Sequence, residues 1–194
     1  MAMSVRTIRV WLVFLAMLHL AGCAAVAITG IAAGTSAVVD RRTTGTMVED
    51  QTIELKAVSA LSADKDLKAQ AHLNVTSFNT VVLVTGETPT EELRNRAIEI
   101  VRNLDKVTHV HNEITVAAPS AIMSRSSDTV ITSKVKTKLL ADSSVEGVHV
   151  KVVTENGVVY LMGVVSRVEG ERAGEIARQT GGVQKVVKLF EYRD

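Results

Sequence analysis

The sequence predicts an α+β fold built from two tandem modules, each with the order helix, strand, strand, helix, strand. Two features carry this prediction: an internal repeat, and a switch between helical and strand spacing of apolar residues in each copy. Residues 50–53 (DQTI) match residues 128–131 (DTVI), and residues 81–86 match residues 158–163. The 194 residues therefore hold two copies of one small module.

The first element of each copy is predicted to be an amphipathic helix. Its apolar residues recur every four positions, as Ile53, Ala57 and Leu61 in the first copy and Ile131, Val135 and Leu139 in the second. We expect Asp50 and Asp128 to cap these helices, because an Asp side chain accepts hydrogen bonds from the first free N–H groups of a helix. Two β-rich runs follow and meet at residues 78–80 and 155–157, where Asn156-Gly157 is a strong hairpin signal.

The second half of each copy is predicted to be a helix and a final strand. Residues 88–91 (TPTE) and 166–169 (SRVE) are each interpreted as a capping box, with Pro89 at the first helical position. The final strands cover 107–116 and 183–192. Because strand-helix-strand crossovers are right-handed, the last strand should lie parallel to the second, giving a three-stranded mixed sheet covered by two helices.

The first 23 residues are typical of a bacterial lipoprotein signal. Arg6 and Arg9 precede an apolar run shorter than the roughly 20 residues that a transmembrane helix needs. Residues 20–23 (LAGC) resemble a lipobox, so we expect residues 1–22 to be removed and Cys23, the only cysteine, to carry the lipid. The alternative is a single uncleaved membrane-spanning helix, because the chain between Val10 and Val39 holds no Asp, Glu, Lys or Arg.

The expected organisation places two folded modules behind a membrane anchor. It comprises a signal peptide at 1–22, a lipidated tether at 23–45, a module at 46–118, a linker at 119–127 and a module at 128–194. Arg41 and Arg42, near the end of the tether, are expected either to contact anionic headgroups or to form a solvated charge pair.

The order of elements resembles the BON module of bacterial osmotic-shock and nodulation proteins. The likeness is carried by the opening helix, the apolar strand ending in Gly86 or Gly163, and the helix that leads to Val107 or Val183. With a lipobox in front, the chain resembles the dual BON-domain outer-membrane lipoproteins, the division- and outer-membrane-stress-associated lipid-binding protein family. This resemblance implies a non-enzymatic protein, lipid-anchored in the outer membrane and facing the periplasm, that binds anionic phospholipid and maintains outer-membrane integrity.

Charge separates the two modules. Residues 46–118 hold 7 Lys and Arg against 11 Asp and Glu, a net of −4, whereas residues 128–194 hold 10 against 9, a net of +1. In the opening helix of the second module, helical spacing places Lys134 and Lys138 together beside Val130. We predict that these three residues bind an anionic phospholipid such as phosphatidylglycerol, although the resemblance implies an aromatic residue, typically Trp, in place of Val130. The alternative is a solvated helix face whose lysines border the core.

No residue set points to catalysis. His109, His111 and Glu113 alternate along the last strand of the first module and so share one side. This spacing suits a metal if another ligand is near, but strand alternation favours an exposed polar face, and we expect no metal site and no cofactor. The near-neutral charge argues against nucleic-acid binding. The alternative to lipid binding is a protein adaptor whose acidic first module docks on the outer-membrane protein assembly machinery or the division apparatus.

Overall fold

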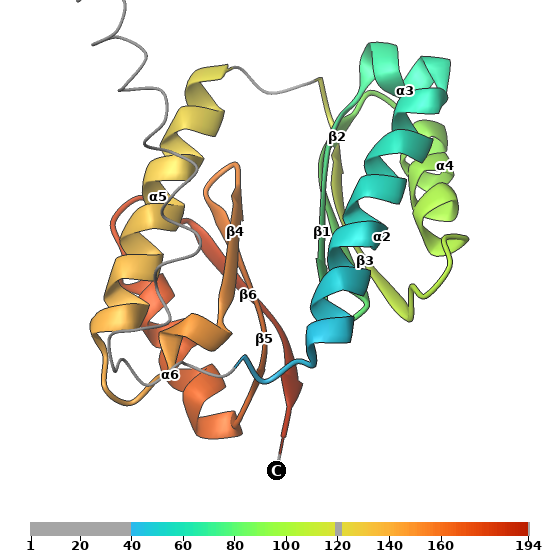
Figure 1. Ribbon diagram of the computed structural model, residues 1–194. Coiled ribbons are helices and arrows are strands. Elements are labelled where there is room, and N and C mark those ends of the chain that lie inside the picture. The colour runs from blue at the N-terminus through green and yellow to red at the C-terminus, as the bar shows by residue number, and fades with distance from the viewer. Residues whose placement is uncertain (1–39, 119–121, 194) are drawn as a thin grey trace, which may run out of the picture. The chain divides into compact units, whose positions relative to one another are not determined.

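The computed structural model describes residues 40–118 and 122–193, which belong to one compact unit. The expected signal peptide, Cys23 and the tether up to residue 39 lie outside the described residues. Each copy of the repeat forms its own three-stranded sheet with helices packed on one face (Figure 1). No helix in the described part of the chain has both the length and the apolar character needed to cross a bilayer.

The predicted order of elements is confirmed in both modules. The first module contains α2 (Thr44–Ala63), a short α3 (Lys65–Gln70), β1 (His72–Phe78), β2 (Val81–Thr88), α4 (Glu91–Arg102) and β3 (His109–Val116). The second contains α5 (Ile122–Ala141), a 3-10 turn η2 (Gly147–His149), β4 (Lys151–Glu155), β5 (Val158–Val165), α6 (Arg167–Arg178) and β6 (Lys185–Tyr192). The sequence did not predict α3 or η2, and α5 includes residues 122–127 of the expected linker.

The predicted mixed sheets and hairpins are also confirmed. The central strands β2 and β5 pair antiparallel with β1 and β4, and parallel with β3 and β6. The φ angles at the two central turn positions are 53° and 64° at Asn79 and Thr80, and 48° and 75° at Asn156 and Gly157. Positive φ at both positions is the requirement of the type I′ turn, whose twist matches that of the flanking strands.

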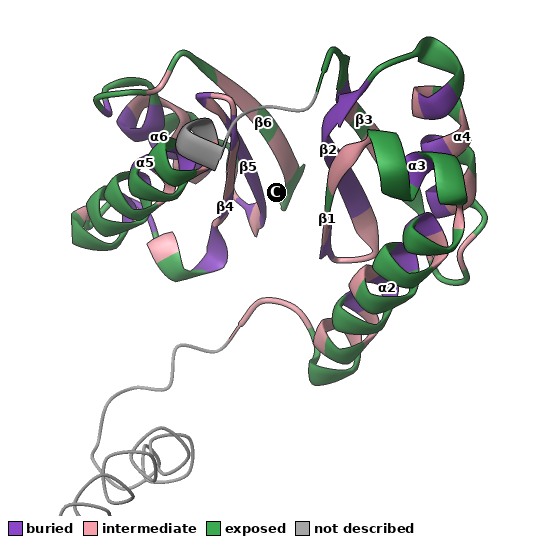
Figure 2. Cartoon of the chain, turned by 90° about the horizontal axis from the view of Figure 1, so that it is seen from above, coloured by how far each residue is buried: buried purple, intermediate pink, exposed green. Residues whose placement is uncertain are grey.

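Each module has its own core between its helices and its sheet. The predicted inward stripe of α2 packs against Val82 and Val84 of β2, and that of α5 packs against Val159 and Leu161 of β5. Figure 2 shows the same division in both modules, with buried residues on the sheet-facing sides of α2 and α5 and exposed residues on their outer sides.

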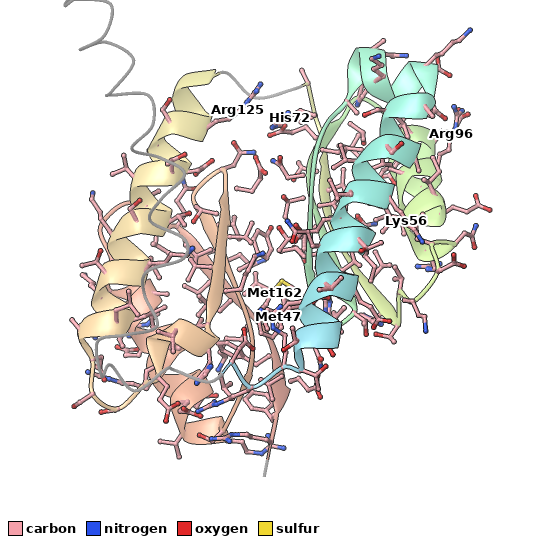
Figure 3. The ribbon with its side chains drawn as sticks, viewed as in Figure 1. Met47, Lys56, His72, Arg96, Arg125 and Met162 are labelled. Atoms are coloured by element: carbon pink, nitrogen blue, oxygen red, sulfur yellow. The ribbon has the colours of Figure 1, made fainter. Side chains whose placement is uncertain are left out.

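The opposite faces of the two sheets contribute to a third apolar cluster. Phe78 and Leu83 of the first module join Tyr160 and Met162 of the second. Met162, labelled in Figure 3, projects from β5 on the side away from α5. Burial raises the pKa of the Tyr160 hydroxyl above its ordinary value, and the nearby Glu113 carboxylate adds to the effect.

The prediction that Asp50 and Asp128 are helix caps is wrong. The helix α2 begins at Thr44, and the Thr43 hydroxyl caps it by accepting from the Thr46 N–H. Asp50 lies nearly two turns further along the helix, is only 3% exposed, and accepts hydrogen bonds of 2.8 Å from the backbone N–H groups of Asn79 and Thr80.

Asp128 occupies the same place in the second module. It accepts from the backbone N–H groups of Asn156 and Gly157 at 2.9 and 2.8 Å. Each buried carboxylate therefore ties the opening helix to the hairpin turn of its own module.

One of the two predicted capping boxes forms. The Ser166 hydroxyl accepts from the Glu169 N–H while the Glu169 carboxylate accepts from the Ser166 N–H, as predicted. In the first module the prediction is wrong, because α4 begins at Glu91 and its cap is Thr90, which accepts from the Leu93 N–H at 3.2 Å. A Thr at position 90 caps a helix as effectively as a Thr at position 88, and the choice of Thr90 makes α4 begin two residues later.

Arg41 and Arg42 form ion pairs with both modules. The Arg41 guanidinium contacts both carboxylate oxygens of Glu169, at 2.7 and 3.0 Å, and this contact lowers the pKa of Glu169 to about 2. Arg42 pairs with Asp40 and with Asp50, both at 2.9 Å. The arginine side chains are only 10% and 14% exposed, so they form largely buried charge pairs instead of the headgroup contacts or the solvated pair considered from the sequence.

Candidate lipid-binding face of helix α5

The orientation of α5 is set by its buried stripe. Ile131, Val135 and Leu139 are at most 4% exposed and point into the core of the second module. The preceding residues of the same helical turns, Val130, Lys134 and Lys138, are therefore turned toward solvent. The Val130 side chain is 52% exposed, so its methyl groups are available to a partner surface.

The three residues predicted to bind lipid lie together in the structure. They line a broad open hollow of about 460 Å³, whose remaining lining residues are Thr129, Ser133 and Thr137. The structure thus brings Val130, Lys134 and Lys138 onto one surface, as helical spacing predicted. Their binding to lipid remains a prediction.

A row of hydroxyl groups beside Val130 makes this surface less polar than its sequence suggests. The side chains of Thr129, Ser133 and Thr137 donate to the carbonyl oxygens four residues earlier, at 3.1, 3.0 and 2.9 Å. Each of these hydroxyl groups already donates its hydrogen bond within the helix. Moving them out of water therefore costs less free energy than moving hydroxyl groups that lack a partner. The sequence analysis missed this row, although the spacing of four between Ser and Thr residues could have indicated it.

The lysines of α5 are not neutralised within the described chain. The Lys138 ammonium donates to the Gln179 carbonyl oxygen at 3.2 Å. Within residues 40–118 and 122–193, no carboxylate forms an ion pair with Lys134, Lys136 or Lys138. This helix therefore presents positive charge to solvent next to an exposed aliphatic side chain.

Within the described residues, the side chains of the histidine row of β3 are not gathered as a set of metal ligands. The His109 and His111 rings meet edge to face with centroids 4.6 Å apart, and burial together with His109 lowers the pKa of His111. Glu113 lies near the Tyr160 hydroxyl at 3.4 Å. Across the described residues there is no group of three or more His, Cys, Asp or Glu side chains placed to hold a metal ion.

Comparison with known proteins places the chain in a family. The BON domain family matches residues 49–118 and residues 127–194. The outer membrane lipoprotein DolP of Haemophilus influenzae is 36% identical over 179 residues, which cover 92% of this chain and 93% of that protein.

Two further relatives cover most of the chain. The 21 kDa hemolysin of Actinobacillus pleuropneumoniae is 39% identical over 154 residues, 79% of each protein. The osmotically-inducible protein Y of Escherichia coli is 33% identical over 145 residues, which cover 73% of this chain and 72% of that protein. The predicted resemblance is confirmed: the chain belongs to the BON domain family and carries two BON domains, an arrangement consistent with a dual BON-domain lipoprotein.

Proposed function

We propose that this protein is an outer-membrane lipoprotein, anchored in the periplasm-facing leaflet through a lipid on Cys23, that binds anionic phospholipid through α5 and thereby supports outer-membrane integrity. The relatives support a role in the cell envelope, because one is named an outer membrane lipoprotein and another an osmotically-inducible protein. In this proposal the protein acts by binding and not by catalysis.

One observation carries the proposal: the outward surface of α5 combines lysines that have no carboxylate partner among the described residues with an apolar side chain at low desolvation cost. Lys134 and Lys138 are available to phosphate groups, and each lysine near an anionic membrane contributes about 1 kcal/mol. Around the helix, Val130 lies between these lysines and the row of hydroxyl groups that already donate to backbone carbonyls. It can therefore enter the headgroup region without burying polar groups that lack a hydrogen-bond partner.

The attraction expected from these residues is weak on its own. Two lysines and one valine supply about 3 kcal/mol, which by itself gives only marginal binding. An anchor on the same chain makes the contact intramolecular and raises the effective concentration of lipid at α5. The proposal therefore assigns retention on the membrane to Cys23 and lipid recognition to the second module.

The decisive experiment measures vesicle binding by the compact unit without its anchor. Residues 39–194 are titrated with vesicles of phosphatidylglycerol and phosphatidylcholine, and with vesicles of phosphatidylcholine alone, at low and physiological salt. We expect binding only to the anionic vesicles, with a loss as salt rises. The double variant Lys134→Glu/Lys138→Glu should lose detectable binding, because each charge reversal costs about 2 kcal/mol near the membrane and the two together exceed the attraction available.

A matched control separates the site from overall charge. The double variant Lys65→Glu/Lys68→Glu changes the net charge equally, at exposed positions of α3 in the first module. We expect it to reduce binding far less than the α5 variant. Equal losses from the two variants would show that only net charge matters, and unchanged binding by the α5 variant would remove α5 as the lipid site.

A further inference from the structure

The outward face of α2 is uncharged and partly apolar. Val48, Leu55 and Val58 are 62%, 68% and 55% exposed, and they follow one another at spacings of seven and three residues. This spacing places them in one row on the side of the helix opposite Ile53. The same face is completed by three polar but uncharged exposed residues, Gln51, Ser59 and Ser62.

The second module shows that the fold does not require this apolar row. The repeat aligns Val48 and Leu55 with Ser126 and Ser133 of α5, and it aligns Val58 with Lys136. All three counterparts are exposed and polar, on a helix of the same length that packs on its sheet in the same way. The fold that the two modules share therefore does not require aliphatic side chains at these outward positions, and a surface that covers them would account for the row on α2.

An anionic bilayer does not suit this face. The first module carries a net charge of −4, and Thr52 and Ala60 stand where α5 has Val130 and Lys138. One ammonium group, that of Lys56, flanks the row on α2, and the Glu49 carboxylate on the same side offsets its attraction for phosphates. A protein surface of matching pattern is the better occupant.

We propose that α2 pairs with α2 of a second copy of this chain, antiparallel and around a twofold axis that passes between residues 52 and 53. This axis places Val48 against the partner's Leu55 and the partner's Val58, and the symmetry repeats the same contact in reverse. The row is therefore complementary to itself, as a symmetric interface requires.

Charge on the flank of the row favours the same arrangement. Glu49 and Lys56 lie on one side of the row, and the twofold axis brings Glu49 opposite the partner's Lys56. Within one chain these side chains make only loose, exposed pairs, Glu49 with Lys106 at 3.8 Å and Lys56 with Asp105 at 3.6 Å. Such exposed pairs are worth little, so exchanging them for pairs across the interface costs little.

The size of the row predicts a weak and reversible pair. The row from Val48 to Val58 spans about 15 Å of helix and offers three aliphatic side chains per copy, far less than a stable dimer buries. Two copies held by lipid anchors in one membrane would meet more often, a step that depends on the function proposed above. The pairing itself does not depend on lipid binding.

Disulfide capture tests the pairing. Residues 39–194 contain no cysteine, so Thr52→Cys introduces a single thiol next to the proposed axis. With copper phenanthroline as oxidant and no lipid present, we expect a disulfide-linked dimer. Adding Leu55→Ser, the residue that α5 carries at the equivalent position, should reduce the yield at least tenfold while the exposed site leaves the fold unchanged.

Controls give each outcome a meaning. Asn95→Cys, exposed on the outer side of α4, should give no more dimer than random collision, and Lys134→Glu/Lys138→Glu should leave the Thr52→Cys yield unchanged. Equal yields from Thr52→Cys and Asn95→Cys, or a yield indifferent to Leu55→Ser, would overturn the proposal. In the intact lipoprotein on cells, a disulfide from Thr52→Cys to another protein in place of the homodimer would also overturn it and would favour the adaptor function.

Discussion

The helices α2 and α5 occupy the same place in the two copies of the repeat, yet the surfaces that they present to solvent differ in chemical character. Both have 20 residues, the same buried stripe, and a buried Asp that holds the hairpin turn. They differ on the outward side, where α2 carries exposed Val48 and Leu55 and α5 carries Ser133 and three lysines without carboxylate partners in the described chain.

This difference separates what folds the module from what the module does. A change at an inward position of either helix opens a cavity or leaves a buried charge unpaired, whereas a change at an outward position usually alters stability by less than about 0.5 kcal/mol. The outward positions were therefore free to diverge, and they assign lipid contact to one copy and protein contact to the other under our proposals.

The largest effect should come from the inward residues that the helices share. Asp50→Ala is expected to destabilise the protein by about 3–5 kcal/mol, because it removes the acceptor for the turn and leaves the largely buried Arg42 without one of its two carboxylates. Asp128→Ala should cost about 1–3 kcal/mol through the loss of its bonds to Asn156 and Gly157. Urea unfolding of residues 39–194 measures both.

The outward position next to Asp50 provides the control. Gln51→Ala should change the free energy of unfolding by less than about 0.5 kcal/mol, since Gln51 is exposed. If Asp50→Ala were as mild as Gln51→Ala, the buried carboxylate would not tie α2 to its hairpin, and the shared inward design of the two helices would be wrong.

Much of the fold could be predicted because the sequence contains the pattern of the module in two copies. The repeat, the spacing of Ile53, Ala57 and Leu61, and the Asn156-Gly157 turn each gave a correct element. The role of Asp50 could not be predicted in the same way. An Asp before an apolar helical stripe has the sequence signature of a cap, and only the extension of α2 back to Thr44 shows that it lies inside the helix.

The candidate site was predicted in part. Helical spacing alone brought Val130, Lys134 and Lys138 together, because they lie on one continuous helix. The contacts of Arg41 were beyond the sequence, since they join a residue before the first module to Glu169, 128 positions away. For Arg41, the long separation along the chain put its partner beyond the reach of any local sequence pattern.

A smaller effect should appear in the pH dependence of stability. The guanidinium of Arg41 lowers the pKa of Glu169 from 4.5 to about 2, so this pair stabilises the fold fully above pH 4.5 and loses its contribution as the pH falls through about 2. After allowing for solvent screening, the contribution at pH 7 is about 2 kcal/mol. Glu169→Gln should therefore be less stable than the parent at pH 7, and the difference should shrink between pH 4.5 and 2.

A second carboxylate of α6 serves as the control for this titration. Glu171 is 73% exposed in its pair with Lys188, and Glu171→Gln should change stability little at any pH. This experiment sharpens the comparison of α2 and α5, because Arg41 precedes α2 but is held by the second module. A difference between Glu169→Gln and the parent that did not vary with pH would mean that the Arg41 pair contributes nothing to stability.

The smallest effect is expected from a substitution that gives the outward surface of α5 a residue of α2. This substitution tests directly whether the different outward residues of the two helices account for their different binding. Val130→Thr copies Thr52, and the exposed site should leave the free energy of unfolding unchanged. Replacing the apolar side chain should weaken binding to phosphatidylglycerol vesicles by about 1 kcal/mol, or about fivefold, while the salt dependence set by Lys134 and Lys138 stays the same. Val130→Trp should shift binding the other way, because an indole buries more apolar surface at the headgroup level. If both variants bound like the parent, Val130 would not enter the membrane, and the lysines alone would distinguish the lipid-facing helix from its counterpart.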